Sequence, residues 1–318
     1  MDTKNSSIYG KAYEYACVLS ALKEVSRHRD VEIIENESLK IAKQCFNEID
    51  TDESNNMLLS AKVGIDAIIE MEPRIIEDGN DILSISLQPD NVATKSGDIR
   101  DMLIIRRSIE WEIGVSVKHN HAALKHSRLS SKLDFGKVWL NRPCSQNYFD
   151  EIGPIFDMLT FMKRQNKKWS DIKNKENDVY IPILHALKKE CLRLNSQQDI
   201  TNSIIKYLIG CNGKDYYKLI HNNNQTITIM PFNIFGTLNL PSETASPSIV
   251  IPQIELPNRI IELEFKEQSN TTLILTMNKG WSISFRIHNA SSNVEASLKF
   301  DIQLQSKPEN IFYLNRRW

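Results

Sequence analysis

Residues 97–118, GDIRDMLIIRRSIEWEIGVSVK, contain the clearest strand signals of the chain. Residues 102–105 form a short apolar run, and apolar residues alternate with others from 109 to 117, a period-two pattern typical of a β-strand. The two segments flank Arg106-Arg107-Ser108, so we expect them to pair as a tight hairpin that turns about Arg107 and Ser108. This hairpin predicts a sheet at the centre of the fold.

The two faces of the second strand differ in chemistry. Because side chains alternate across a strand, the apolar odd-numbered positions 111–117 share one face and the even-numbered positions 112–118 share the other. The expected turn places Asp101 opposite Gly114, on the face of Ser116 and Lys118, whereas a one-residue change of register would place Asp98 there. A lysine that ends a buried strand needs a partner, since burying an unpaired ammonium group is costly.

A carboxylate that converges with a lysine beside small residues suits metal-assisted hydrolysis of phosphodiesters. Mg²⁺ prefers oxygen ligands and stabilises the charge that develops on a scissile phosphate. Asp101, or Asp98 in the other register, is the expected Mg²⁺ ligand, and Lys118 is expected to orient or help deprotonate the attacking water. The same pattern also occurs in purely structural hairpins.

The rest of the chain divides into helical and β-rich parts. We expect helices at 8–29, 36–49, 57–72 (after a polar break at 51–56), 121–132 and through most of 148–210, and strands at 82–87, 226–230, 260–265, 271–277, 281–288 and 298–304. The Pro-rich residues 241–257 are the best linker candidate.

This order of elements predicts an α/β (α+β) protein with a mixed sheet flanked by helices and a β-rich C-terminal part, rather than a doubly wound nucleotide-binding fold. We expect residues 1–220 to contain the helices and the catalytic hairpin. Residues 221–318 are expected to form a β-rich region that completes the fold or recognises DNA, and the two parts could form one continuous domain.

The charge of the chain is uneven along its length. Its 318 residues include 39 Lys and Arg and 40 Asp and Glu, a net charge of −1. Residues 30–101 hold 17 acids and 6 bases, which leaves 33 bases and 23 acids elsewhere. A nucleic-acid partner is therefore compatible with the near-neutral total.

Several classes of protein are excluded by composition. No apolar run approaches the roughly 20 residues that span a bilayer, and residues 1–5 lack the basic start and apolar core of a signal peptide. The five cysteines are scattered without a CxxC pair, as expected of thiols in a reducing cytoplasm. We therefore expect a cytoplasmic protein without a membrane partner.

Longer motifs narrow the class of nuclease. An Asp before an apolar strand and a Lys at the end of the next strand resemble the PD-(D/E)xK nuclease core. Over residues 9 to about 304, the chain resembles the HaeIII-type type II restriction endonucleases. The resemblance is carried by YGKAYEYA at 9–16, GDIRD at 97–101, EIGVSVKHNH at 112–121, KHSR at 125–128, GWSISFRIHNA at 280–290 and SLKF at 297–300.

The sequence departs from the nuclease pattern at one position. The resemblance implies an acid two residues before Lys118, but Ser116 stands there. Glu70, near the end of the third expected helix, is our candidate for the missing carboxylate, because a helix often packs beside this core in such nucleases. Glu72, Glu112 and a site with a single carboxylate are the alternatives.

Several polar residues are candidates for contacts with DNA. The segment after Lys118 and the C-terminal strands offer His119, Asn120, His121, Lys125, His126, Arg128, Arg286, His288, Asn289 and Lys299. An HNH nuclease is disfavoured because its histidines and asparagine would be dispersed rather than contiguous. A zinc site at the first three histidines of this set is also disfavoured, since no cysteine lies nearby.

The resemblance implies a Mg²⁺-dependent type II restriction endonuclease that cleaves double-stranded DNA within GGCC. The main alternative is a non-catalytic DNA-binding protein on the same scaffold, favoured by Ser116. A structure-specific or repair nuclease is a further alternative. The oligomeric state, monomer or homodimer, is left open by the sequence.

Overall fold

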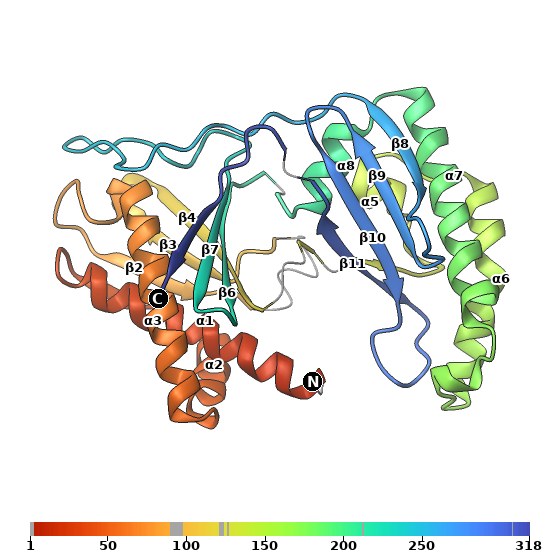
Figure 1. The fold of residues 1–318 in the computed structure, drawn as a ribbon, viewed down its shortest axis with the longest axis horizontal. Coiled ribbons are helices and arrows are strands. Elements are labelled where there is room, and N and C mark those ends of the chain that lie inside the picture. The colour runs from red at the N-terminus through yellow and green to blue at the C-terminus, as the bar shows by residue number, and fades with distance from the viewer. Residues whose placement is uncertain (1–2, 90–97, 121–123, 126, 212, 307) are drawn as a thin grey trace. The chain divides into compact units, whose positions relative to one another are not determined.

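The computed structural model describes residues 3–89, 98–120, 124–125, 127–211, 213–306 and 308–318. The chain forms two compact units, each built from segments distant in sequence (Figure 1). Unit 1 comprises residues 1–122, 211–254 and 310–318, and unit 2 comprises residues 123–210 and 255–309. Both units combine helices with a sheet, so the predicted α/β (α+β) class is confirmed.

Unit 1 contains a seven-stranded mixed sheet in the order β1-β2-β3-β4-β6-β7-β12. The pairs β1/β2 and β4/β6 are parallel, and the other neighbours are antiparallel. The strands are β1 (Val31–Ile33), β2 (Leu83–Leu87), β3 (Met102–Arg106), β4 (Trp111–His119), β6 (Tyr216–Asn222), β7 (Thr226–Phe232) and β12 (Leu314–Arg317).

Two helices cover one face of this sheet. α1 (Thr3–Val25) packs on β2 and β4, α3 (Thr51–Met71) packs on β6, β7 and β12, and α2 (Glu37–Glu48) packs on α1. The polar residues 51–56, predicted as a break, belong to α3 because Asp50 caps the helix by accepting a 2.9 Å hydrogen bond from the Glu53 N–H. Pro73 begins a short 3₁₀ turn (Pro73–Ile75), so α3 ends where predicted.

The hairpin of β3 and β4 forms as predicted, but in a different register. Leu103 lies opposite Gly114, so Asp101 falls two positions from its expected partner. The turn is a 3₁₀ helix (Arg107–Ile109) that ends in a left-handed residue, Glu110, at φ 50°. The buried Arg106 guanidinium at the end of β3 binds Asp81 at 3.1 Å and three carbonyl groups. A shift of two residues keeps Asp101 on the predicted face.

Unit 2 contains a five-stranded antiparallel sheet in the order β5-β11-β10-β9-β8. Its strands are β5 (Arg128–Leu129), β8 (Ile260–Phe265), β9 (Thr272–Met277), β10 (Ser282–His288) and β11 (Leu298–Leu304). Its helices are α5 (Phe135–Leu140), α6 (Gln146–Arg164), α7 (Ile181–Gln197) and α8 (Thr201–Leu208), with short turns at Trp169–Asp171 and Glu176–Tyr180.

The predicted helix over residues 121–132 is wrong where the structure describes it. Arg128 and Leu129 form β5 beside β11, and Lys125 makes an isolated bridge with Ile302. The local pattern is overridden by pairing with a strand far along the chain. Residues 241–257 form an irregular connection, as predicted, and no helix in the described residues is long and apolar enough to cross a membrane.

Candidate active site

Asp101 and Lys118 meet at one edge of the catalytic hairpin. Asp101 directly precedes β3, and its backbone N–H donates to the Val115 carbonyl at 2.9 Å. Its Oδ2 accepts hydrogen bonds from the Val117 N–H at 2.7 Å, from Lys118 Nζ at 3.0 Å and from Ser116 Oγ at 3.3 Å. The side chains of Asp101 and Lys118 are 23% and 27% exposed, so the pair is held by the strand yet open to a ligand.

Helix α1 brings a second carboxylate to this pair. Glu14 is only 7% exposed. Burial and, as the second cause, the charge of Asp101 raise its pKa to about 8, although Lys11, which donates to it at 3.0 Å, and Lys118 lower it. The Asp101 charge thus disfavours ionisation of Glu14, and a cation bound beside Glu14 would stabilise its ionised form.

Glu14 is a candidate site residue that our sequence analysis missed. Its signal was present, because Glu14 is an acid among the buried residues Ala12, Tyr13, Ala16 and Cys17 of α1. An acid at such a position needs a polar partner. The partner could not be named without the packing of α1 on β4.

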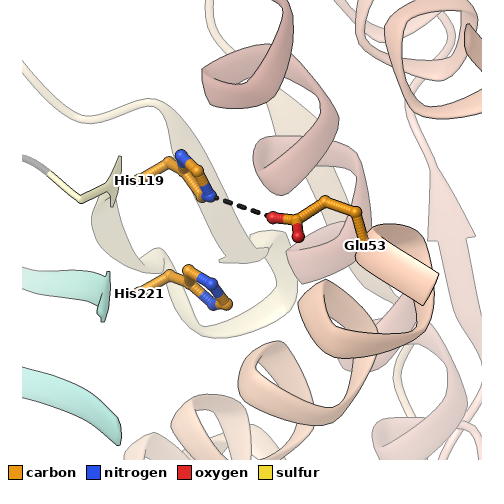
Figure 2. Close-up of side chains that lie close together, drawn as sticks. All are labelled: Glu53, His119 and His221. Atoms are coloured by element: carbon orange, nitrogen blue, oxygen red, sulfur yellow. Dashed lines mark hydrogen bonds and ion pairs between the residues drawn. The ribbon is translucent and has the colours of Figure 1, made fainter. Parts of the chain in front are cut away.

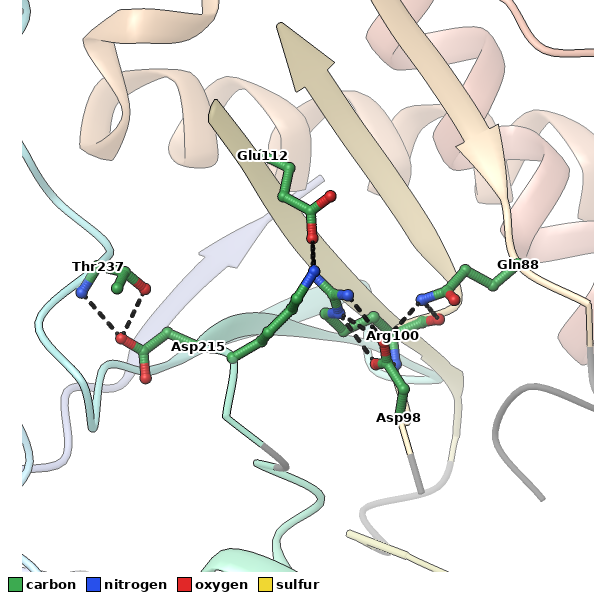
Figure 3. Close-up of polar contacts among 7 residues, drawn as sticks. Gln88, Asp98, Arg100, Glu112, Asp215 and Thr237 are labelled. Carbon is green, nitrogen blue, oxygen red and sulfur yellow. Dashed lines mark hydrogen bonds and ion pairs between the residues drawn. The ribbon is translucent and has the colours of Figure 1, made fainter. Parts of the chain in front are cut away.

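Asp98 is held by Arg100 rather than by Lys118 (Figure 3). The Arg100 guanidinium donates to Asp98 Oδ2 at 2.7 Å and to Glu112 Oε1 at 3.0 Å, and the Arg100 side chain covers Gly114. Burial alone would raise the pKa of Asp98, but its hydrogen bonds with Arg100 bring that pKa below its usual range. Lys214 also contacts Glu112. The alternative register that would bring Asp98 to Lys118 is therefore not adopted.

The structure does not bring Glu70 to Asp101. Both Glu70 carboxylate oxygens accept from Arg316 of β12, at 2.8 and 2.6 Å, and this ion pair lowers the Glu70 pKa. β12 lies four strands from β3, a separation of roughly 19 Å at the usual strand spacing. The alternative Glu72 is buried elsewhere, where it accepts from the Tyr217 hydroxyl at 2.6 Å.

His119 and Asn120 lie at the end of β4, beside residues of β6 and α3 (Figure 2). His119 Nε2 is 3.3 Å from Glu53 Oε1, and its ring stacks on His221 with centroids 4.9 Å apart. Asn120 has φ 52°, and its amide lies 3.4 Å from His119 Nδ1. The predicted DNA contacts His121 and His126 lie outside the described residues.

In unit 2, four of the predicted DNA contacts share one face of the sheet. His288 is opposite Lys299, and Lys299 is opposite Arg128, so these side chains project from the same face. Arg286 is two residues before His288 on β10 and is exposed. Burial lowers the Lys299 pKa, and the Arg128 charge lowers it further, while Glu295 and Asp301, which lies opposite Arg286 on the same face, raise it.

Two other predicted contacts are engaged within unit 2. Lys125 Nζ lies 3.7 Å from the Tyr207 ring centroid and donates to the Tyr207 carbonyl at 3.2 Å. The Asn289 amide accepts from the Tyr180 hydroxyl at 3.0 Å and donates to the Ser291 carbonyl at 2.7 Å. Arg128 is only partly engaged, since it is 49% exposed while it contacts Glu295 at 3.2 Å.

Comparison with known proteins decides the family. The sequence model of the HaeIII restriction endonuclease family matches residues 10–308. The chain belongs to the HaeIII restriction endonuclease family. It is 42% identical to the type II restriction enzyme HaeIII of Haemophilus aegyptius, over 99% of each chain. No solved structure matches the chain.

Membership of the HaeIII family makes the protein a type II site-specific deoxyribonuclease. The matched residues include Glu14, Asp101 and Lys118 and extend through both units. The two carboxylates and the lysine described above are thus the natural place to look for its chemistry.

Proposed function

We propose that this HaeIII-family enzyme hydrolyses phosphodiester bonds of double-stranded DNA in the cytoplasm, at a site built from Asp101, Glu14 and Lys118, with Mg²⁺ as cofactor and GGCC as target. The observation that carries the site is the 3.0 Å contact of Asp101 with Lys118 at the edge of the hairpin, and Glu14 is added because α1 packs on β4 and the charges of Asp101 and Lys118 both act on it. The target rests on the similarity to the Haemophilus aegyptius enzyme.

The residues present fit a hard divalent cation. Asp101 and Glu14 supply carboxylate oxygens, which Mg²⁺ prefers, and burial together with the Asp101 charge raises the Glu14 pKa to about 8. Bound there, Mg²⁺ would stabilise the negative charge that develops on the scissile phosphate. Glu14 takes the place that we had assigned to Glu70, and it compensates for the serine at position 116.

The residues around this pair hold it in position. The Val117 N–H and Ser116 Oγ both donate to Asp101 Oδ2, which fixes the carboxylate against β4. Lys118 Nζ donates to the same oxygen at 3.0 Å and has two further N–H groups to offer. The ammonium group can therefore orient an attacking water or contact a phosphate oxygen while it remains anchored.

DNA binding is proposed for the basic sheet face of unit 2, defined by Arg128, Arg286, His288 and Lys299. Basic side chains bind phosphates, and arginine or lysine pairs well with the O6 and N7 atoms of guanine. Burial and then the Arg128 charge lower the Lys299 pKa, and a bound anion would favour the charged form of Lys299. A guanine-rich target favours Arg286 and Lys299 as the residues that contact bases.

A digest of one long defined DNA tests this function. We expect fragments that end within GGCC when Mg²⁺ is present, and no cleavage in EDTA. Cleavage at unrelated sites would favour a structure-specific or repair nuclease. Specific binding without cleavage in any divalent metal would favour the non-catalytic alternative, for which the serine at position 116 is the supporting observation.

A further inference from the structure

Three potential metal ligands converge in unit 1, apart from the Asp101 carboxylate. Glu53 comes from the first turn of α3, His119 from the end of β4 and His221 from β6 (Figure 2). Their ligand atoms all lie within 4.8 Å of one another. The sequence could not reveal this group, because His221 is about a hundred residues from His119 and meets it through the parallel pairing of β4 with β6.

His221 indicates that the cluster is more than a hydrogen-bonded pair. Its ring is 3% exposed, and its Nδ1 is buried without a hydrogen-bond partner in the described structure. A buried polar atom without a partner is costly and needs an explanation. The 3.3 Å contact between His119 and Glu53 satisfies those two residues but leaves His221 unexplained.

Neighbouring aromatic rings hold both imidazoles in place. Tyr9 stacks on His119 with ring centroids 5.4 Å apart, and Trp318 stacks on His221 with centroids 5.0 Å apart. The rings are therefore fixed by packing, and an imidazole nitrogen is a common ligand of transition metals.

We propose that Glu53, His119 and His221 bind one divalent transition-metal ion of the Zn²⁺ class, at a site distinct from that of Asp101 and Glu14. Two imidazole nitrogens and one carboxylate suit a borderline ion such as Zn²⁺ rather than Mg²⁺, which prefers oxygen ligands. Zn–N distances near 2.1 Å place tetrahedral ligand atoms about 3.4 Å apart. The ligand atoms lie within 4.8 Å of one another, so side-chain rotations that bring them at most about 1.4 Å closer complete the site.

The ion would connect three elements beside the catalytic lysine. His119 directly follows Lys118, and the Asn120 N–H donates to the His221 carbonyl at 2.8 Å. Binding at this site would hold the ends of β4 and β6 against the first turn of α3. The ion would thereby fix the strand end that carries Lys118 without touching the scissile phosphate.

Metal titration tests the site without any measurement of cleavage. The full chain with Asp101→Asn and Glu14→Gln, freed of metal, would be titrated with Co²⁺ followed by visible absorption, and with Zn²⁺ followed by calorimetry. We expect one equivalent of either ion and a Co²⁺ spectrum typical of nitrogen ligation. Because the Asp101 pair is disabled in this background, the result does not depend on the proposed catalytic site.

Substitutions assign the bound ion to the three residues. Glu53→Gln and His221→Gln should each weaken binding at least about tenfold, since even outer-shell partners of metal ligands contribute that much. His28→Gln, at an exposed histidine of unit 1, is the matched control and should bind like the parent. Glu53 is partly exposed at the start of its helix, so its variant should fold. The proposal is overturned if the parent binds no Co²⁺, or if both glutamine variants bind as the parent does.

Discussion

Glu14→Gln should stabilise the metal-free protein while it abolishes cleavage. The substitution keeps the shape of the side chain and removes a charge that burial and Asp101 disfavour. Substitution of a residue that supports the fold lowers the stability of the protein. A buried carboxylate retained for metal binding instead destabilises the metal-free protein, and the bound metal offsets this effect. The two effects therefore have opposite signs, which separates a catalytic role from a structural one.

The magnitude follows from the Glu14 pKa, which is about 8 in the folded protein against an ordinary 4.5. A raised acid pKa means that the folded state disfavours the ionised form, so stability is highest below pH 4.5 and falls as pH rises from 4.5 to 8. At 1.36 kcal/mol for each pH unit above 4.5, Glu14 lowers the folding stability at pH 7.5 by about 4 kcal/mol relative to acidic pH. Glutamine removes this cost, so the variant should gain stability at pH 7.5 and little at pH 4.5.

Urea unfolding at the two pH values, without metal, measures the gain. Added Mg²⁺ should raise the unfolding midpoint of the parent more than that of Glu14→Gln, and plasmid cleavage by the variant should fall at least about a hundredfold. Glu24→Gln is the matched control, because Glu24 is equally buried on α1 and pairs with Arg27. A variant that loses stability at pH 7.5, or that cleaves like the parent, would refute the assignment of Glu14.

Three further predictions concern other parts of the chain. Lys118→Ala should abolish cleavage but retain specific binding in a gel-shift assay, and parent-like cutting would remove it from the site. Burial raises the Glu72 pKa to about 7, so the parent should lose about 3 kcal/mol of folding stability as the pH rises from 4.5 to 7. Glu72→Gln should not show this loss. The reasoning fails if the variant's urea midpoints keep the parent's pH dependence. Lys299→Ala should weaken DNA binding and, if Lys299 contacts a phosphate, reduce the salt slope of log K by about 0.9. An unchanged affinity for DNA would show that Lys299 does not contact DNA.

The parts of the fold that the sequence predicted well are those set by local patterns. The limits of β8 and β11 agree with the prediction because alternating apolar residues define both strands. The convergence of Asp101 with Lys118 could be predicted because the two strands are adjacent in the chain and share a short turn. The register differed by two residues because the connection spans four residues, Arg107 to Glu110, instead of the two expected.

The parts that failed depend on contacts between distant segments. The segment around Arg128 has a helical pattern but becomes a strand because β11 offers a paired edge. Glu70 was our candidate for the second carboxylate because of its place on a helix. In the structure it forms an ion pair with Arg316, near the end of the chain. Glu14 joins the site only because α1 packs on β4, a contact that no local periodicity encodes.

The most direct test of the proposed site compares Asp101→Asn with Asp98→Asn. Cleavage of a plasmid with GGCC sites would be followed over a Mg²⁺ titration, with DNA binding measured in Ca²⁺ for each variant. We predict that Asp101→Asn binds DNA but does not cut at any Mg²⁺ concentration, because Asp101 is the carboxylate that Lys118 contacts. Asp98→Asn should still cut, since Asp98 pairs with Arg100. An active Asp101→Asn enzyme beside an inactive Asp98→Asn enzyme would contradict the proposed site.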